Sequence, residues 1–368
     1  MSSTVEREGT AVPSGAFHET RYGALGLYGY VLVGALLMFL LVRSWNDPIA
    51  LRAVSKVLIT VLAVLGVNVA TGYGGMISLG HGAFVGVGAF ATGWFVDDGG
   101  LPWLLAIPAG GLVAGLAGCL IGVPALRIRG IHLALVTLAA AVLFQPLAKQ
   151  EHLVRFSGGG SGRAIDARVV SPDWFGDSRA ADSRWQFLLC LGVCLVAFWL
   201  TRNLLSGVPG RAIRSLRDNQ TSAAVFGVNL VRTRVGTFAV SAGLAGVAGS
   251  LQVVLVPFVS QENYPPQQSL ILYAAAVIGG LGWLWGSVFG VMVRAAAAWV
   301  GDLLDRVNTV PLLSQFFDLL ASDTFVFGIG LIALTFVFPA GIAGIAPRSW
   351  SVGRMRRWAA SRYSTQEL

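Results

Sequence analysis

Long apolar runs recur along nearly the whole chain and are separated by short polar stretches. A helix needs about 20 predominantly apolar residues to cross the hydrocarbon core of a membrane, so each run predicts a transmembrane helix. The runs that meet or approach this length are 23–42, 53–71, 76–96, 102–123, 131–148, 185–201, 235–256 and 324–345. A further run, 269–300, is too long for one crossing.

Glycines interrupt two of these regions, as GYGG at 72–75 and as GGLG at 279–282. Glycine costs roughly 1 kcal/mol relative to alanine inside a helix, so both clusters predict a broken backbone. Breaks at membrane depth are tolerated beside protein or a watery cavity, and paired breaks indicate a transport site. We therefore expect 269–300 to form two segments. Glycines at 82, 86, 88 and 93 predict close helix packing, as the four-residue spacing of Gly82 and Gly86 illustrates.

Composition agrees with a membrane protein. The chain is 55% hydrophobic and 12% charged, with a mean hydropathy of +0.70, whereas soluble domains carry about a quarter charged residues. No stretch remains for a separate soluble catalytic domain of about 100 residues. The predicted fold is all-α: a polytopic integral membrane helical bundle of about 8–10 transmembrane helices with glycine-broken segments.

The distribution of arginine and lysine predicts the topology. With the N-terminus inside, more basic residues fall on the cytoplasmic side, as membrane proteins prefer. We expect a polar cytoplasmic N-terminal tail (1–22), a transmembrane domain (23–346) and a basic cytoplasmic tail (347–368). Within the domain, 149–184 is expected to be an external loop. The basic segment 202–234 predicts an amphipathic helix on the cytoplasmic face, where binding of lipid headgroups alone could also explain it.

The sequence carries no enzyme signature. Its two lysines, Lys56 and Lys149, do not follow the glycine pattern of a nucleotide-binding P-loop, and HExxH, CxxC and GxSxG are absent. The four histidines are scattered, so we expect no metal site, no cofactor and no catalytic residues. Basic residues are not interleaved with aromatics, which argues against a nucleic-acid partner. Membrane lipid is the expected surroundings.

Polar residues inside apolar runs are the candidates for a transport path, because an unsatisfied polar group in hydrocarbon is costly. Each has a structural alternative. His81 could bond to a neighbouring helix's carbonyl, Thr137 to its own helix backbone, and Gln252 could join two helices. The candidate path residues are Asn68, Gly74, Gly75, Ser78, His81, Thr137, Gln252, Gly279 and Gly280.

Four blocks in order resemble the LivM-type permease subunits of branched-chain amino-acid ABC importers. They are 72-GYGGMISLGHGAFVGVGAF-90, 126-LRIRGIHLALVTLA-139, 210-GRAIRSLRDNQTSAAVFGVN-229 and 278-IGGLGWLWGSVFG-290. The resemblance implies that 23–346 is a permease domain, and that 210–229 is the coupling loop with which such permeases dock onto a separate ATPase. The coupling residues it implies are Gly210, Arg211, Arg214, Arg217, Asp218, Asn219, Ser222, Ala223 and Gly227.

This loop departs from the Glu-Ala-Ala-x-x-x-Gly pattern common in ABC permeases. It carries Thr221-Ser222-Ala223 and then Gly227, so the acidic residue is missing. The resemblance therefore does not extend to a docking contact made by that carboxylate.

The resemblance implies a permease in the plasma or inner membrane that works by alternating access and imports branched-chain or other hydrophobic amino acids. Its implied partners are a second homologous permease subunit, two ATPase subunits that bind the ATP, and an extracytoplasmic substrate-binding protein. One alternative is the permease of a urea or short-chain amide importer. Another is a self-sufficient channel or secondary transporter, which the lack of acids in the cores of the first seven apolar runs disfavours.

Overall fold

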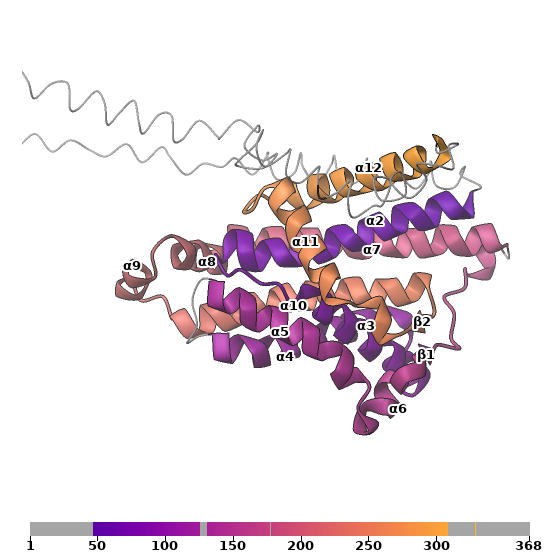
Figure 1. Ribbon diagram of the computed structural model, residues 1–368, viewed down its shortest axis with the longest axis horizontal. Coiled ribbons are helices and arrows are strands. Elements are labelled where there is room, and N and C mark those ends of the chain that lie inside the picture. The colour runs from indigo at the N-terminus through magenta and orange to yellow at the C-terminus, as the bar shows by residue number, and fades with distance from the viewer. Residues whose placement is uncertain (1–46, 126–130, 177, 308–327, 329–368) are drawn as a thin grey trace, which may run out of the picture. The chain divides into compact units, whose positions relative to one another are not determined.

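The computed structural model describes residues 47–125, 131–176, 178–307 and 328 (Figure 1). All its helices and strands belong to the unit that begins at Pro48. The predicted helices 23–42 and 324–345 and the two predicted tails, 1–22 and 347–368, lie outside the described residues apart from position 328.

Helices account for nearly all the regular structure of the described part. The longer ones are α2 (Pro48–Val67), α3 (His81–Asp97), α4 (Trp103–Ala125), α5 (Ile131–Ala148), α7 (Arg179–Ser206), α8 (Val208–Asp218), α10 (Leu230–Leu255), α11 (Pro266–Gly279) and α12 (Gly286–Val307). The short ones are α6 (Val154–Ser157) and α9 (Gln220–Val225), and a π-helical turn, Asn68–Tyr73, prolongs α2. Two strands, β1 (Arg163–Ala164) and β2 (Phe258–Val259), pair antiparallel with Arg163 opposite Val259.

Four helical stretches in the described part are long and apolar enough to cross a membrane: 48–73, 103–123, 179–206 and 230–255. A fifth would be α5 with the helix that follows it, which bend by 80° at their junction. The all-α membrane bundle is thereby confirmed. Fewer runs are full-length spans than expected, because 76–96 becomes the 17-residue α3 and 269–300 divides between α11 and α12.

Both predicted breaks are confirmed. The first helix ends at Tyr73 and the chain resumes helix at His81, while α11 ends at Gly279 and α12 begins at Gly286. The segment predicted as a coupling loop, 202–234, includes the end of α7 at Ser206 and the start of α10 at Leu230. Between them lie two short helices, α8 and α9, rather than one.

Helix α10 lies at the centre of the bundle and packs against α2, α3 and α4 (Figure 1). Glycine makes this possible where α3 crosses α10, because a Cβ on Gly88 would overlap the backbone of Gly246. Close approach through small residues is typical of membrane helices. The predicted small-residue packing of α3 is therefore confirmed, with Gly88 as its tightest point.

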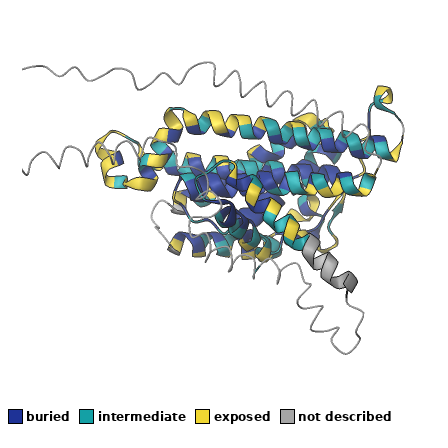
Figure 2. Cartoon of the chain, turned by 90° about the horizontal axis from the view of Figure 1, so that it is seen from above, coloured by how far each residue is buried: buried dark blue, intermediate teal, exposed yellow. Residues whose placement is uncertain are grey.

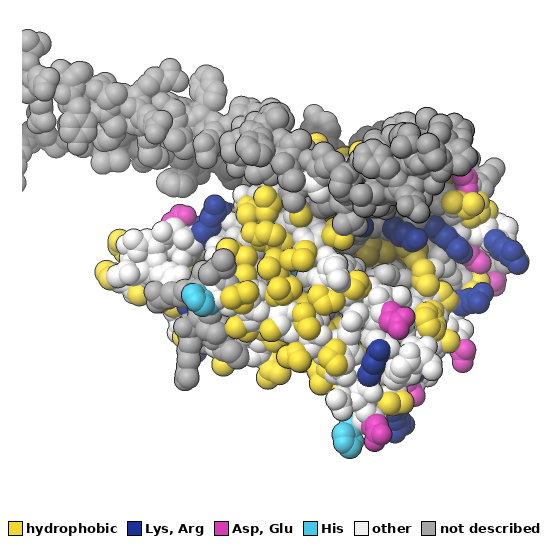
Figure 3. All heavy atoms as spheres, viewed as in Figure 1, with side chains coloured by type: hydrophobic (Ala, Val, Ile, Leu, Met, Phe, Trp, Pro, Cys, Tyr) yellow, Lys and Arg dark blue, Asp and Glu magenta, His cyan; other side chains and the backbone are white. Residues whose placement is uncertain are grey.

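The outer faces of the bundle are apolar. On α4, Leu112, Leu116 and Leu120 stand four residues apart and are 61–77% exposed. Figure 2 shows buried positions on the inward helix faces, and Figure 3 shows hydrophobic side chains covering the middle of one face with charges toward its ends. A continuous apolar surface of this kind fits a lipid environment rather than water.

The segment predicted as an external loop, 149–184, contains α6 and β1 and lies at one end of α7, whereas α8 and α9 lie at the other (Figure 1). Arg163 at β1 forms ion pairs with Asp97 and Asp98 at the end of α3. Strand β2 follows α10 directly, so the strand pair ties this segment to the end of the central helix.

Candidate functional site

The two glycine breaks lie side by side, joined by one buried amide. Asn68 Nδ2 donates to the carbonyl oxygen of Trp283 at 2.7 Å and contacts Ser287 Oγ at 3.3 Å. Its Oδ1 accepts from the backbone N–H of Gly282 at 2.8 Å. Backbone groups released by a break need new partners inside a membrane, and Asn68 supplies them across 214 residues of sequence. We call Asn68, 72–75 and 280–287 the break junction.

Glycine is required at the turns of the junction. Gly75, Gly280 and Gly282 have φ angles of +66°, +104° and +81°, where other L-residues are strained. Gly279 packs against the backbone of Gly286, which brings the ends of α11 and α12 together. Gly74 closes the π-helical turn by donating its N–H to the carbonyl of Val69 at 3.1 Å.

Arg217 on α8 connects the basic helix to the junction. Its Nη1 donates to the carbonyl of Gly72, its aliphatic stem lies over Gly75, and a Cβ added to Gly282 would meet its guanidinium. Ile213 and Leu216 on the same helix are buried against the bundle. Hence α8 is held both by apolar packing and by a charged hydrogen bond to the backbone at the first break.

The other predicted coupling residues form the frame of α8 and α9. Gly210 packs against the backbone of Leu205, and Arg214 donates to the carbonyl of that residue. Asn219 caps α9 by accepting from Ser222 N at 3.0 Å, and Gly227 ends the segment with φ at +81°. Ala223 is buried, whereas Arg211 and Asp218 are exposed.

An apolar tip lies at the far end of this frame. Val225 and Phe226 are 80% and 86% exposed, the highest values among the large hydrophobic residues of the described part, equalled only by Ile49 at 80%. They follow the basic helix along the chain, where α9 projects from the end of the described bundle (Figure 1). Sequence patterning missed this tip, although two adjacent large apolar residues in a polar loop were a visible signal.

His81 is a buried junction of three helices. Its Nε2 lies 2.6 Å from Ser241 Oγ on α10, and Ser241 in turn donates to the carbonyl of Gly66 on α2 at 2.6 Å. Its Nδ1 lies 3.1 Å from Ser78 Oγ. Because Ser241 gives its proton to Gly66, His81 Nε2 donates and Nδ1 accepts. The side chain is 1% exposed, so it is enclosed by the helices that it joins.

Thr137, like His81, joins two segments of the described structure through buried hydrogen bonds. Its hydroxyl accepts from the backbone N–H of Leu79 at 2.9 Å and donates to the carbonyl of Ala134 at 3.0 Å. It therefore joins α5 to the non-helical segment before α3, and it also makes the bond to its own helix that the sequence left open. Ser78 and Thr137 are both fully buried.

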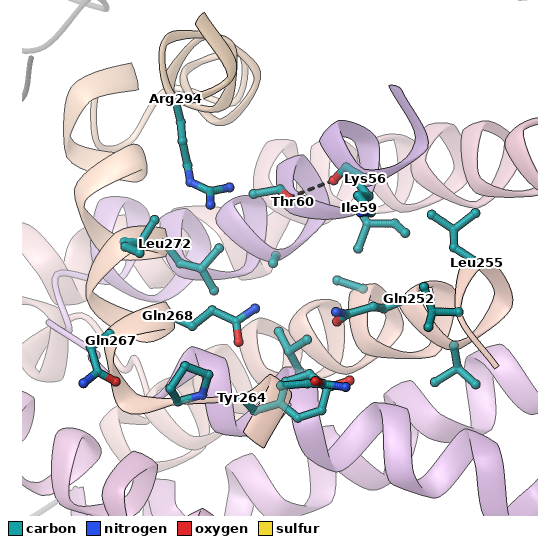
Figure 4. A pocket seen from close by; sticks show the side chains of 18 of the residues that line it. Lys56, Ile59, Thr60, Gln252, Leu255, Tyr264, Gln267, Gln268, Leu272 and Arg294 are labelled. Carbon is teal, nitrogen blue, oxygen red and sulfur yellow. Dashed lines mark hydrogen bonds between the residues drawn. The ribbon is translucent and has the colours of Figure 1, made fainter. Parts of the chain in front are cut away.

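Gln252 differs, because it lines a cavity of about 550 Å³ bounded by α2, α3, α10, α11 and α12 and by the segment between α10 and α11 (Figure 4). Ligand pockets in proteins have volumes of about 300–1,000 Å³. The polar and charged residues around it are Lys56, Thr60, Gln252, Asn263, Tyr264, Gln267, Gln268 and Arg294. Apolar residues such as Ile59, Val253 and Leu272 complete its wall.

Of the predicted path residues, only Gln252 lies at this cavity; Asn68 and the glycines form the break junction. Lys56 and Arg294 were missed as candidates. Both sit inside apolar runs, where an ionisable residue is by default a functional candidate, so the sequence did carry a signal. No group of three histidine, cysteine or carboxylate side chains that could hold a metal occurs in the part of the chain that is described.

Known proteins that are similar in sequence to this chain are all named as transport permeases. The profile of a family described as "Branched-chain amino acid transport system / permease component" matches residues 49–320. The chain is 29% identical over 271 residues to the high-affinity branched-chain amino acid transport system permease protein LivM of Salmonella typhimurium, covering 68% of this chain and 62% of that protein. The LivM protein of Escherichia coli is 28% identical over 283 residues, covering 70% and 64%.

A more distant relative is the probable branched-chain amino acid transport permease protein LivH of Methanocaldococcus jannaschii, 30% identical over 144 residues, or 37% of this chain and 41% of that protein. The matched region thus spans less than two thirds of the length of each relative. No solved structure matches the chain significantly.

Proposed function

Because the chain belongs to the branched-chain amino acid transport permease family, we propose that it is the permease subunit of an ATP-driven importer of branched-chain or other hydrophobic amino acids. In this proposal it binds no ATP itself. Two separate ATPase subunits supply the energy, a second homologous permease completes the membrane path, and an extracytoplasmic binding protein delivers the cargo. The relatives are transport permeases, and the chain is a multi-pass membrane protein.

The observation that carries the proposal is the continuous connection from the apolar tip to the break junction. Val225 and Phe226 offer the exposed apolar surface on which a partner protein binds, since aromatic anchors dominate interface energies. Helix α8 joins this tip to Gly72 through Arg217. A displacement of α8 by an ATPase would therefore move the glycine-broken backbone, where transporters change between their inward and outward states.

The proposed topology follows from the same assignment. With α8 and α9 facing the cytoplasm, α7 crosses the membrane and its N-terminal end, with 149–184, faces outward. The tails 1–22 and 347–368 are proposed to be cytoplasmic, in line with the arginines of the second.

A second candidate is the import of short-chain amides. Four amide side chains, Gln252, Asn263, Gln267 and Gln268, line the cavity. Amides hydrogen-bond well to other amides because each offers both a donor and an acceptor. The same ATPase coupling would serve either cargo.

Docking of an ATPase on the tip is tested with two valine variants. Val225→Asp places a charge on the proposed interface, and Val170→Asp makes the same change at a 64% exposed position in 149–184. After purification from membranes of the native host, Val225→Asp is expected to lose at least about 90% of the co-purifying P-loop ATPase, since burying an unpaired charge is costly. Val170→Asp should retain it. Equal recovery of ATPase with both variants would refute the docking surface.

A further inference from the structure

Positively charged side chains line the cavity of about 550 Å³ to which Gln252 contributes. Lys56 on α2 and Arg294 on α12 are the two charged residues among its described lining, which includes no carboxylate. Figure 4 shows Arg294 extending from α12 toward the space beside Thr60 and Lys56. Two cations facing a partly enclosed space favour an anionic group there and disfavour a cationic one.

A second observation concerns an unsatisfied acceptor at the same cavity. Gln268 Oε1 is buried and has no hydrogen-bond partner within the described part of the chain. Its side chain points toward Gln252 across the cavity (Figure 4). A buried polar atom without a partner destabilises the site, so a ligand that brings an N–H donor to Gln268 Oε1 removes that penalty when it binds.

The third feature is the apolar wall. Ile59 and Ala63 from α2, Val253 from α10 and Leu272 from α11 surround the polar groups. An aliphatic side chain of a ligand would be removed from water here, which favours binding in proportion to the apolar surface that is buried.

We infer that this cavity holds the cargo during import, with the cargo's carboxylate at Lys56 and Arg294, its amino group at Gln268 Oε1, and its aliphatic side chain against the apolar wall. The ligand class is a free α-amino acid with an uncharged aliphatic side chain. Amides and esters of such acids lack the anion, and lysine or arginine would bring a further cation into a cationic site. This inference rests on the proposed import function and names the cargo chemistry of the same site.

The test measures equilibrium binding of radiolabelled leucine to the assembled transporter in lipid nanodiscs, without the binding protein. Leucinamide, which lacks the carboxylate, and 4-methylpentanoate, which lacks the amino group, are used as competitors. We expect 4-methylpentanoate to displace leucine and leucinamide to do so at least tenfold less well. Lys56→Gln and Arg294→Gln should each weaken leucine binding about tenfold, or about 1.4 kcal/mol.

Arg52→Gln is the matched control, because Arg52 lies one helical turn before Lys56 on α2, is exposed, and does not line the cavity. It should bind leucine like the wild type, and so should Lys56→Arg, which keeps the charge. The inference is overturned if leucine does not bind, if leucinamide competes as well as leucine itself, or if neither glutamine variant weakens binding. ATP-driven leucine uptake by the wild-type complex, measured in parallel, separates these failures from failure of the proposed function.

Discussion

At the scale of single residues, polar side chains in this protein join segments that the sequence separates widely. Asn68 reaches groups more than 200 positions away, and His81 on α3 is linked to α10 and α2 through Ser241. These residues were predicted as path residues because they are polar in apolar runs. Their burial and saturated hydrogen bonds favour a role in holding the path's walls together, although their effect on uptake stays a prediction.

His81→Leu is expected to lower the thermal stability of the purified protein. The variant leaves the hydroxyls of Ser78 and Ser241 with one buried partner fewer each, which costs on the order of 1–3 kcal/mol. The midpoint of heat-induced aggregation measures this, with His132→Leu at an exposed position of α5 as the control. A His81→Leu protein as stable as wild type but unable to transport would instead place His81 on the path.

Arg217→Ala is expected to uncouple ATP hydrolysis from transport. The guanidinium is the hydrogen-bonded link from α8 to Gly72, so without it α8 can move while the break junction stays in place. Leucine uptake per ATP hydrolysed in proteoliposomes should fall about tenfold while the ATPase still co-purifies. Arg202→Ala, in the last turns of α7, serves as the control. An unchanged ratio for Arg217→Ala would exclude Arg217 from coupling.

At the scale of elements, hydrophobic patterning located most of the described helices and both breaks. Glycine spacing also predicted the close packing of α3, since the lack of a side chain is readable without knowing the neighbour. Patterning could not predict which distant segment each helix or break packs against. That Gly88 meets Gly246, or that the break at 72–75 meets the break at 280–285, depends on contacts between distant segments. Local sequence periodicity carries no information on such pairings.

Gly88→Ala is expected to separate α3 from α10. In an isolated helix this change would stabilise by up to about 1 kcal/mol, but here the new methyl group would overlap the Gly246 backbone. Gly192→Ala on α7 is the control, because no described atom lies within 4 Å of the added carbon. It measures the effect of helix propensity alone, without a steric clash. Gly88→Ala should lower the melting temperature by several degrees and Gly192→Ala should not. Equal melting temperatures would show that the helices do not pack at Gly88.

At the scale of the whole molecule, the family and the all-α membrane fold were predictable from four sequence blocks and the apolar runs. The cavity was not, because its lining comes from five helices and one connecting segment spread between Lys56 and Arg294. Of the lining residues, the sequence predicted only Gln252 as part of a transport path. Lys56 and Arg294 could have been found by asking which ionisable residues lie inside apolar runs. The pair Val225-Phe226 could likewise have been noticed as apolar residues in a polar loop, but only the fold shows that both are exposed.

ATP-driven import by a complex is tested most directly by leucine uptake into sealed proteoliposomes. The chain is reconstituted with the second permease and ATPases that co-purify with it, and radiolabelled leucine is supplied with the binding protein. We expect leucine to accumulate against its gradient only when ATP and all partners are present. Leucine uptake by this chain alone, without ATP, would contradict the importer assignment and identify a self-sufficient channel or carrier.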